Sequence, residues 1–175
     1  MSVVINGSAG VTTNSGAVYN SLQVGTAITS ASGSSLDFAS IPSWVERITI
    51  SLNNISFAAT GAAVVRLGVS NTLVTSGYVA ARFGITTAPA VVYTAVTDGV
   101  ASFGTSAAAS TAIGHIVLTN PTGNEWVASG QVFRTTDNVY MTTAGSITLS
   151  GKLTNLSLVA TTSTFDAGSV NIIYE

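Results

Sequence analysis

Ionisable side chains are the first place to look for chemistry, and this sequence has few of them. His115 is the only histidine, and it lies in the stretch GHIVLTN, where no nucleophile or acid stands at a spacing that catalytic motifs use. The chain has no cysteine, so neither thiol chemistry nor a zinc site is expected. His115 is therefore interpreted as an exposed or hydrogen-bonded residue of a strand.

The seven acidic residues also lack the spacing of a catalytic or metal-binding motif. Asp98 and Asp137 stand beside Gly, Thr or Asn, where an aspartate commonly stabilises a turn. No calcium loop, G-x-G-x-x-G motif or P-loop is found. We expect a protein without enzymatic activity, cofactor or metal. An enzyme that uses two carboxylates to act on a glycan is the least favoured alternative.

Large aromatic side chains are the remaining candidates for binding. Rigid aromatics stack on sugar rings and are enriched at subunit interfaces, and core packing is the competing role for each of them. The candidate glycan or interface contacts are Trp44, Trp126, Tyr78, Tyr93 and Tyr140.

Charge is the most unusual feature of the composition. Charged residues make up 7% of the chain, against about 25% in an average soluble domain, whereas hydrophobic residues stand at 46%. A surface of hydroxyl, amide and small apolar groups offers little electrostatic protection against association, so we expect an oligomer. The net charge of −2 provides no basic surface, and nucleic acid is not expected as a partner.

The elements that must position these residues are strands, because apolar and polar residues alternate with period two along most of the chain. We expect an all-β antiparallel β-sandwich resembling a jelly roll, and we expect residues 102–114 to form a long loop rich in small residues. The predicted strands are 17–24, 34–38, 44–53, 62–69, 78–85, 91–96, 114–119, 125–133, 139–149 with a break near Ala144, 153–160 and 168–174.

The first 35 residues differ in composition from the rest. INGSAGVTTNSG lacks the apolar area to form a core, so residues 1–35 are predicted to be an anchoring arm and residues 36–175 the β-sandwich domain. The start MSVVINGSAG has no secretory signal, and no apolar run approaches the roughly 18 residues of a membrane-spanning helix. We expect synthesis in the cytoplasm and no membrane partner.

Four stretches together resemble a β-domain of tailed-bacteriophage virion proteins, of the tail-fibre, appendage and head-decoration type. They are SLDFASIPSWVERITISLNNIS, VVRLGVSNTLVTSGYVA, NEWVASG and SITLSGKLTNLSLVATTSTFDAGSVNIIYE, and the resemblance extends from about Leu36 to the last residue. It implies a non-enzymatic structural protein on the virion surface, made in the bacterial cytoplasm and assembled as a symmetric oligomer, with a trimer expected.

Two functions follow from this resemblance. The first is a capsid decoration protein or short appendage subunit that binds other virion proteins. The alternative is a tail-fibre protein that attaches to a glycan of the host surface.

Overall fold

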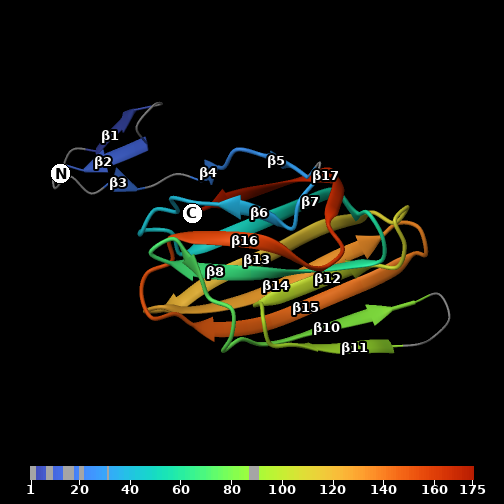
Figure 1. Ribbon diagram of the computed structural model, residues 1–175. Helices are drawn as coiled ribbons and strands as arrows, with labels where there is room; N and C mark the ends of the chain where they lie inside the picture. The colour runs from blue at the N-terminus through green and yellow to red at the C-terminus, as the bar shows by residue number, and fades with distance from the viewer. Residues whose placement is uncertain (1–2, 7–9, 14–17, 20–21, 31, 87–90) are drawn as a thin grey trace.

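Two antiparallel sheets packed face to face contain most of the strands in the computed structural model (Figure 1). The structure describes residues 3–6, 10–13, 18–19, 22–30, 32–86 and 91–175. The prediction of an all-β antiparallel sandwich is confirmed.

The larger sheet has nine strands. Its spatial order is β11 (Val91–Val96), β10 (Val79–Ile85), β15 (Val139–Thr148), β14 (Glu125–Arg134), β13 (Ala112–Thr122), β7 (Arg47–Phe57), β17 (Phe165–Tyr174) and β4 (Gln23–Val24), and β5 (Ile28–Thr29) also pairs with β17. The smaller sheet has the order β12 (Ala101–Thr105), β8 (Gly61–Val69), β16 (Asn155–Thr162) and β6 (Ser35–Phe38), with β9 (Thr72–Leu73) paired to β8. A separate three-stranded sheet contains β1 (Val3–Asn6), β2 (Gly10–Thr13) and β3 (Val18–Tyr19).

The core lies between the two large sheets and follows from the alternation in the sequence. Ile48 and Ile50 of β7 are fully buried, while Thr49 between them is only partly buried. Val65 and Leu67 supply the facing layer from β8. Burying one face of each strand in this way provides most of the stabilising free energy of a sandwich.

Two expectations about individual segments are wrong. The expected loop 102–114 is a strand at both of its ends. Residues 102–105 belong to β12, in which every residue is buried, and residues 112–114 begin β13. The expected break near Ala144 is absent, because β15 pairs with β14 without a shift of register from Val139 to Thr148. The strand that contains the buried Phe103 has no polar alternation, and this explains why its sequence looks like a loop.

Part of the predicted arm is attached to the sandwich. β4 and β5 pair with β17, and the backbone N–H groups of Gly25 and Ser30 donate to the carbonyl oxygens of Ile172 and Gly168. The Ser30 side chain is buried and donates to the Ala167 carbonyl at 2.5 Å. Residues 1–2, 7–9, 14–17, 20–21 and 31 of the predicted arm lie outside the described residues.

Within the described ranges, the protein has no helix of the length and apolar character needed to cross a membrane.

Candidate functional site

Two of the five candidate aromatic residues lie in the core. Trp126 of β14 is 2% exposed and Tyr78 is 4% exposed, so neither side chain can reach a surface ligand in this structure. The Tyr78 hydroxyl accepts a hydrogen bond from the Leu67 N–H and donates to the Val74 carbonyl, both at 2.9 Å. Burial raises the pKa of this hydroxyl, consistent with a structural role.

The other three aromatic residues are partly or largely accessible. Trp44 packs against the core with its ring 5.8 Å from that of Tyr174, at the opposite end of the larger sheet from β11. Tyr93 of β11 and Tyr140 of β15 are exposed on the outer face of that sheet. Phe83 of β10 pairs with Tyr93 across the strands, with ring centroids 5.2 Å apart. Tyr93 and Tyr140 therefore belong to one surface.

Strand register shows how far this surface extends. Val91 pairs with Ile85, Ile85 with Tyr140, Tyr140 with Phe133, and Phe133 with Ile113, so one apolar row crosses five strands. We call the surface formed by this row and the three parallel rows beside it the uncharged face. Its members, row by row, are Val91, Ile85, Tyr140, Phe133 and Ile113; Tyr93, Phe83, Thr142, Gln131 and His115; Ala95, Ala81, Ala144, Ser129 and Val117; and Val79, Ser146, Val127 and Thr119.

The uncharged face contains no Lys, Arg, Asp or Glu, and its only basic residue is the exposed His115. Its exposed large apolar residues are Val79, Phe83, Ile85, Val91, Tyr93, Ile113, Val127 and Tyr140. Aromatic side chains carry about 150–250 Å² and aliphatic ones somewhat less, so the exposed parts of these eight residues together present on the order of 800 Å². Contiguous apolar patches of more than a few hundred Å² mark interaction sites.

Strand β11 forms the bare edge of this surface. It is the last strand of the larger sheet beyond β10, and its sequence VVYTAV contains no charge and no proline. Val91, Val92 and Tyr93 are exposed in succession, which means that both sides of the strand are accessible at this end. Natural edge strands usually carry charges, proline or a bulge that prevents pairing with another strand, and the described part of β11 has none of these.

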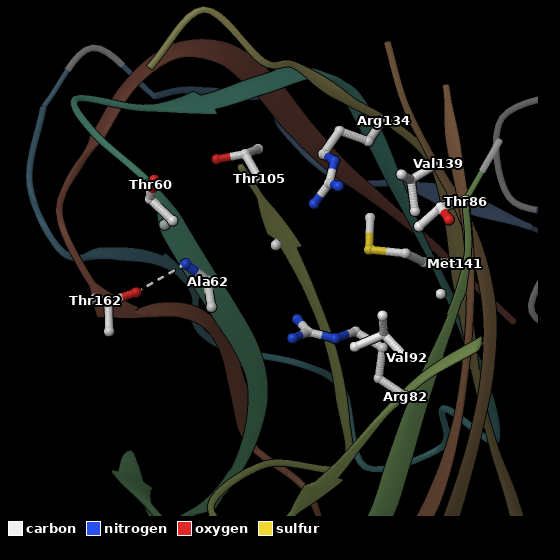
Figure 2. Close-up of a pocket in the computed structure, with 13 residues that line it drawn as sticks. Thr60, Ala62, Arg82, Thr86, Val92, Thr105, Arg134, Val139, Met141 and Thr162 are labelled. Carbon is white, nitrogen blue, oxygen red and sulfur yellow. Dashed lines mark hydrogen bonds between the residues drawn. The ribbon is translucent and has the colours of Figure 1, made fainter. Parts of the chain in front are cut away.

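A cavity of about 240 Å³ lies beneath the β10–β11 hairpin, on the side of the sheet opposite the uncharged face (Figure 2). Arg82 and Arg134 enter it from β10 and β14, and both guanidinium groups point into the same space. Val92, Val139 and Met141 form an apolar wall. The rest of the lining consists of threonines at positions 60, 86, 105 and 162 and of the small residues Gly61, Ala62, Gly84 and Gly104.

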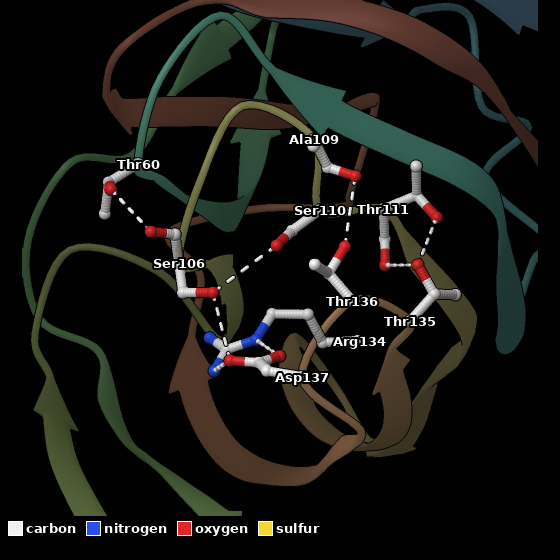
Figure 3. A network of polar contacts seen from close by, with 9 residues as sticks. All are labelled: Thr60, Ser106, Ala109, Ser110, Thr111, Arg134, Thr135, Thr136 and Asp137. Atoms are coloured by element: carbon white, nitrogen blue, oxygen red, sulfur yellow. Dashed lines mark hydrogen bonds and ion pairs between the residues drawn. The ribbon is translucent and has the colours of Figure 1, made fainter.

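A polar network holds Arg134 in place at the rim of the cavity (Figure 3). Its Nε donates to Asp137 Oδ1 at 2.6 Å, and its Nη2 donates to Oδ2 of the same carboxylate. The Ser106 hydroxyl donates to Asp137 Oδ2 at 3.0 Å, and the Ser106 carbonyl accepts from the Thr60 hydroxyl at 2.8 Å. The Arg134 guanidinium holds the pKa of Asp137 below its ordinary value, so this carboxylate is ionised at neutral pH.

Arg82 has no such counter-charge. The ion pairs formed by the described residues join Arg47 to Glu175, Arg66 to Asp98 and Arg134 to Asp137. Arg82 Nη1 is completely buried without a hydrogen-bond partner, and the same is true of the Thr105 hydroxyl. Burial, and secondly the charge of Arg134, lowers the pKa of Arg82. Among the described residues, no acidic side chain forms an ion pair with it.

The sequence alone gave no indication of this cavity. Arg82 stands in the run VAARFGI between Ala81 and Phe83, and alternation does not reveal which of its two sides faces inward. The low number of Lys and Arg residues could have drawn attention to Arg82, since the chain has only five. In the part of the chain that the structure describes, no group of three His, Cys, Asp or Glu side chains could hold a metal ion.

Comparisons with protein-family models, with curated proteins and with solved structures find no match to this chain. The resemblance to the phage virion β-domains stays a prediction.

Proposed function

We propose that this protein is a non-enzymatic structural subunit that assembles with copies of itself through the uncharged face, and that it belongs to the surface of a tailed-phage virion as a capsid decoration or short appendage protein. The observation that carries the proposal is the absence of charge across four rows of an exposed sheet face that ends in a bare edge strand.

A second copy of the same chain is the occupant that suits this face best. In a symmetric contact each residue near the axis meets its own copy, so charged residues there would be placed against like charges. A face without charges avoids this cost. Its apolar area, on the order of 800 Å², equals what one partner contributes to a standard protein interface. The bare backbone of β11 can also pair with a strand of the neighbouring subunit.

The position on a virion rests on the resemblance in the sequence, and the trimer rests on it as well. A low-charge, cysteine-free sandwich that is stabilised by subunit contacts suits a particle surface. The β4–β5 segment continues the larger sheet at the edge away from β11, and the described strands β1–β3 form a separate sheet that is proposed to contact another virion protein.

Sedimentation of variants tests the assembly. We expect the wild type to sediment as an oligomer at micromolar concentration and Phe83→Glu to shift to the 17.6 kDa subunit, because the new carboxylate would be buried at the interface. Val24→Glu is the matched control, since Val24 is an exposed apolar residue at the opposite edge of the same sheet. A wild type that remains monomeric, or a Phe83→Glu variant that remains oligomeric, would contradict the proposal.

Labelled electron microscopy tests the location. Antibodies against the purified protein, applied to particles from cultures that produce it, are expected to label the capsid lattice. Labelling of the tail alone would instead support host attachment, and unlabelled particles would exclude both virion roles. Host attachment is the second candidate function, and the cavity with the uncompensated Arg82 favours it because such a site can bind part of a glycan.

A further inference from the structure

The cavity beneath the β10–β11 hairpin combines an uncompensated cation with groups suited to a small polar ligand. Asp98 and Asp137 are the acidic residues that could have neutralised Arg82, but their carboxylates are already paired with Arg66 at 3.0 Å and with Arg134. Two guanidinium groups and one carboxylate leave one positive charge in excess at this site. A bound ligand with a single negative charge would balance it.

The residues that surround the Arg82 guanidinium are small. A Cβ atom added to Gly104 of β12 would lie 3.1 Å from Arg82 Nη1 and 2.9 Å from the Gly61 carbonyl oxygen. The absence of a side chain at this position therefore leaves room for the guanidinium at the floor of the cavity. Thr105 follows directly, and its hydroxyl is buried without a partner in the same lining. Arg82 Nη1 and the Thr105 hydroxyl are enclosed by the protein, so the groups of Arg82 that are open to a ligand are its remaining N–H groups.

From this arrangement we infer that the cavity binds a sugar acid, that is, a monosaccharide-sized ligand with one carboxylate and several hydroxyl groups, held by Arg82 and Arg134. Arginine N–H groups bind carboxylates strongly, and a monoanion matches the single excess charge better than a phosphate dianion. Arg134 already uses Nε and Nη2 for Asp137, so Nη1 is the group that it offers the ligand. The threonine hydroxyls suit the ligand's hydroxyl groups, and Val139 and Met141 suit the C–H face of a pyranose ring.

The volume limits the size of the ligand. At about 240 Å³ the cavity is smaller than the roughly 300–1,000 Å³ of sites for drug-sized ligands, so it accommodates one ring and not a disaccharide. A longer acidic glycan would place one terminal or side-branch residue in it. The inference deepens the second candidate function, and it does not depend on self-assembly through the uncharged face.

Calorimetric titration with D-glucuronate and D-galacturonate tests the inference. We expect at least one of these acids to bind the wild-type protein, and glucose and galactose to bind at least about tenfold more weakly, since a hydrogen bond to a charged group contributes about 1.5–3 kcal/mol. Arg82→Met is expected to lose about ten- to hundredfold in affinity by the same reasoning. Lys152→Met is the matched control, because it removes one exposed positive charge outside the cavity.

Three results would overturn the inference: no binding of either sugar acid to the wild type, equal binding to Arg82→Met, or equal binding of acetate and inorganic sulfate. The last result would define a simple anion site. If neutral sugars bind and sugar acids do not, this inference fails while host attachment survives. If sugar acids bind and particles are unlabelled, the virion function fails while this inference survives.

Discussion

The two edges of the larger sheet differ in whether another segment of the chain covers them. At one edge β17 is covered by β4 and β5, whose backbone groups pair with it and whose Ser30 side chain is buried against it. At the other edge β11 has no neighbour beyond β10 among the described strands, and its apolar side chains are exposed. The chain thus covers one edge with its own N-terminal segment, and among the described residues it leaves the other edge uncovered.

Removing β4 and β5, which cover β17, should have the largest effect on the free energy of unfolding. Deletion of residues 2–30 would remove the hydrogen bonds of Gly25 and Ser30, and we expect a loss of roughly 3–5 kcal/mol in the free energy of unfolding at about 1 kcal/mol per bond plus the lost burial. Deletion of residues 2–22 keeps β4 and β5 and should leave this free energy within about 1 kcal/mol of the wild type. Urea unfolding measures both, and equal stability of the two deletions would show that the cover is dispensable.

A smaller change, and a gain in the free energy of unfolding instead of a loss, is expected from replacing Arg82 in the cavity beneath the β10–β11 hairpin. Arg82→Met removes a buried cation without a counter-charge, so we expect the ligand-free protein to gain about 1–2 kcal/mol in the free energy of unfolding. Such a gain is typical where a residue serves binding at a cost in stability. Lys152→Met should change the value by less than about 0.5 kcal/mol. Destabilisation by Arg82→Met would instead assign Arg82 a structural role.

The smallest expected change is the pH-dependent contribution of Asp137 to the free energy of unfolding. Since the pKa of Asp137 is lowered in the folded state, its ionised form stabilises the fold at pH values above its ordinary pKa, and this contribution is lost as pH falls through the lowered value. The difference in unfolding free energy between wild type and Asp137→Asn should therefore be present at pH 7 and shrink below about pH 4, with a size under about 1 kcal/mol because the carboxylate is partly exposed. A difference that grows on acidification would contradict the assignment.

Alternation was sufficient to predict the sandwich and most of its strands, because a one-sided strand carries its burial pattern in its sequence. It failed for β12, which is buried along its whole length and is built from ASFGT. It also could not separate Trp126 and Tyr78, which lie in the core, from Tyr93 and Tyr140, which lie outside. Which side of a strand faces inward depends on the position of the second sheet, and the sequence of one strand does not contain that information.

The cavity could not be predicted for a related reason. Arg82, Thr105 and Arg134 come from three strands and meet only because β12 of the smaller sheet lies across β10 and β14 of the larger one. Nothing in their spacing along the chain marks them as neighbours. The lack of a counter-charge at Arg82 is likewise a property of the folded chain. From the sequence alone, Asp98 or Asp137 could each be the partner of Arg82, whereas in the structure they pair with Arg66 and Arg134.

Amide hydrogen exchange of the two edges tests the central claim most directly. In strand β11, the amides that point away from β10 are expected to exchange slowly in concentrated wild-type protein and faster on dilution or in Phe83→Glu, because only a second copy can cover this free side of the strand. The β11 amides that bond to β10 serve as an internal reference. The amides of Gly25 and Ser30, which bond within the chain, should exchange at the same rate under all three conditions. Equal exchange of β11 at every concentration and in the variant would contradict the claim that a second copy covers the bare edge.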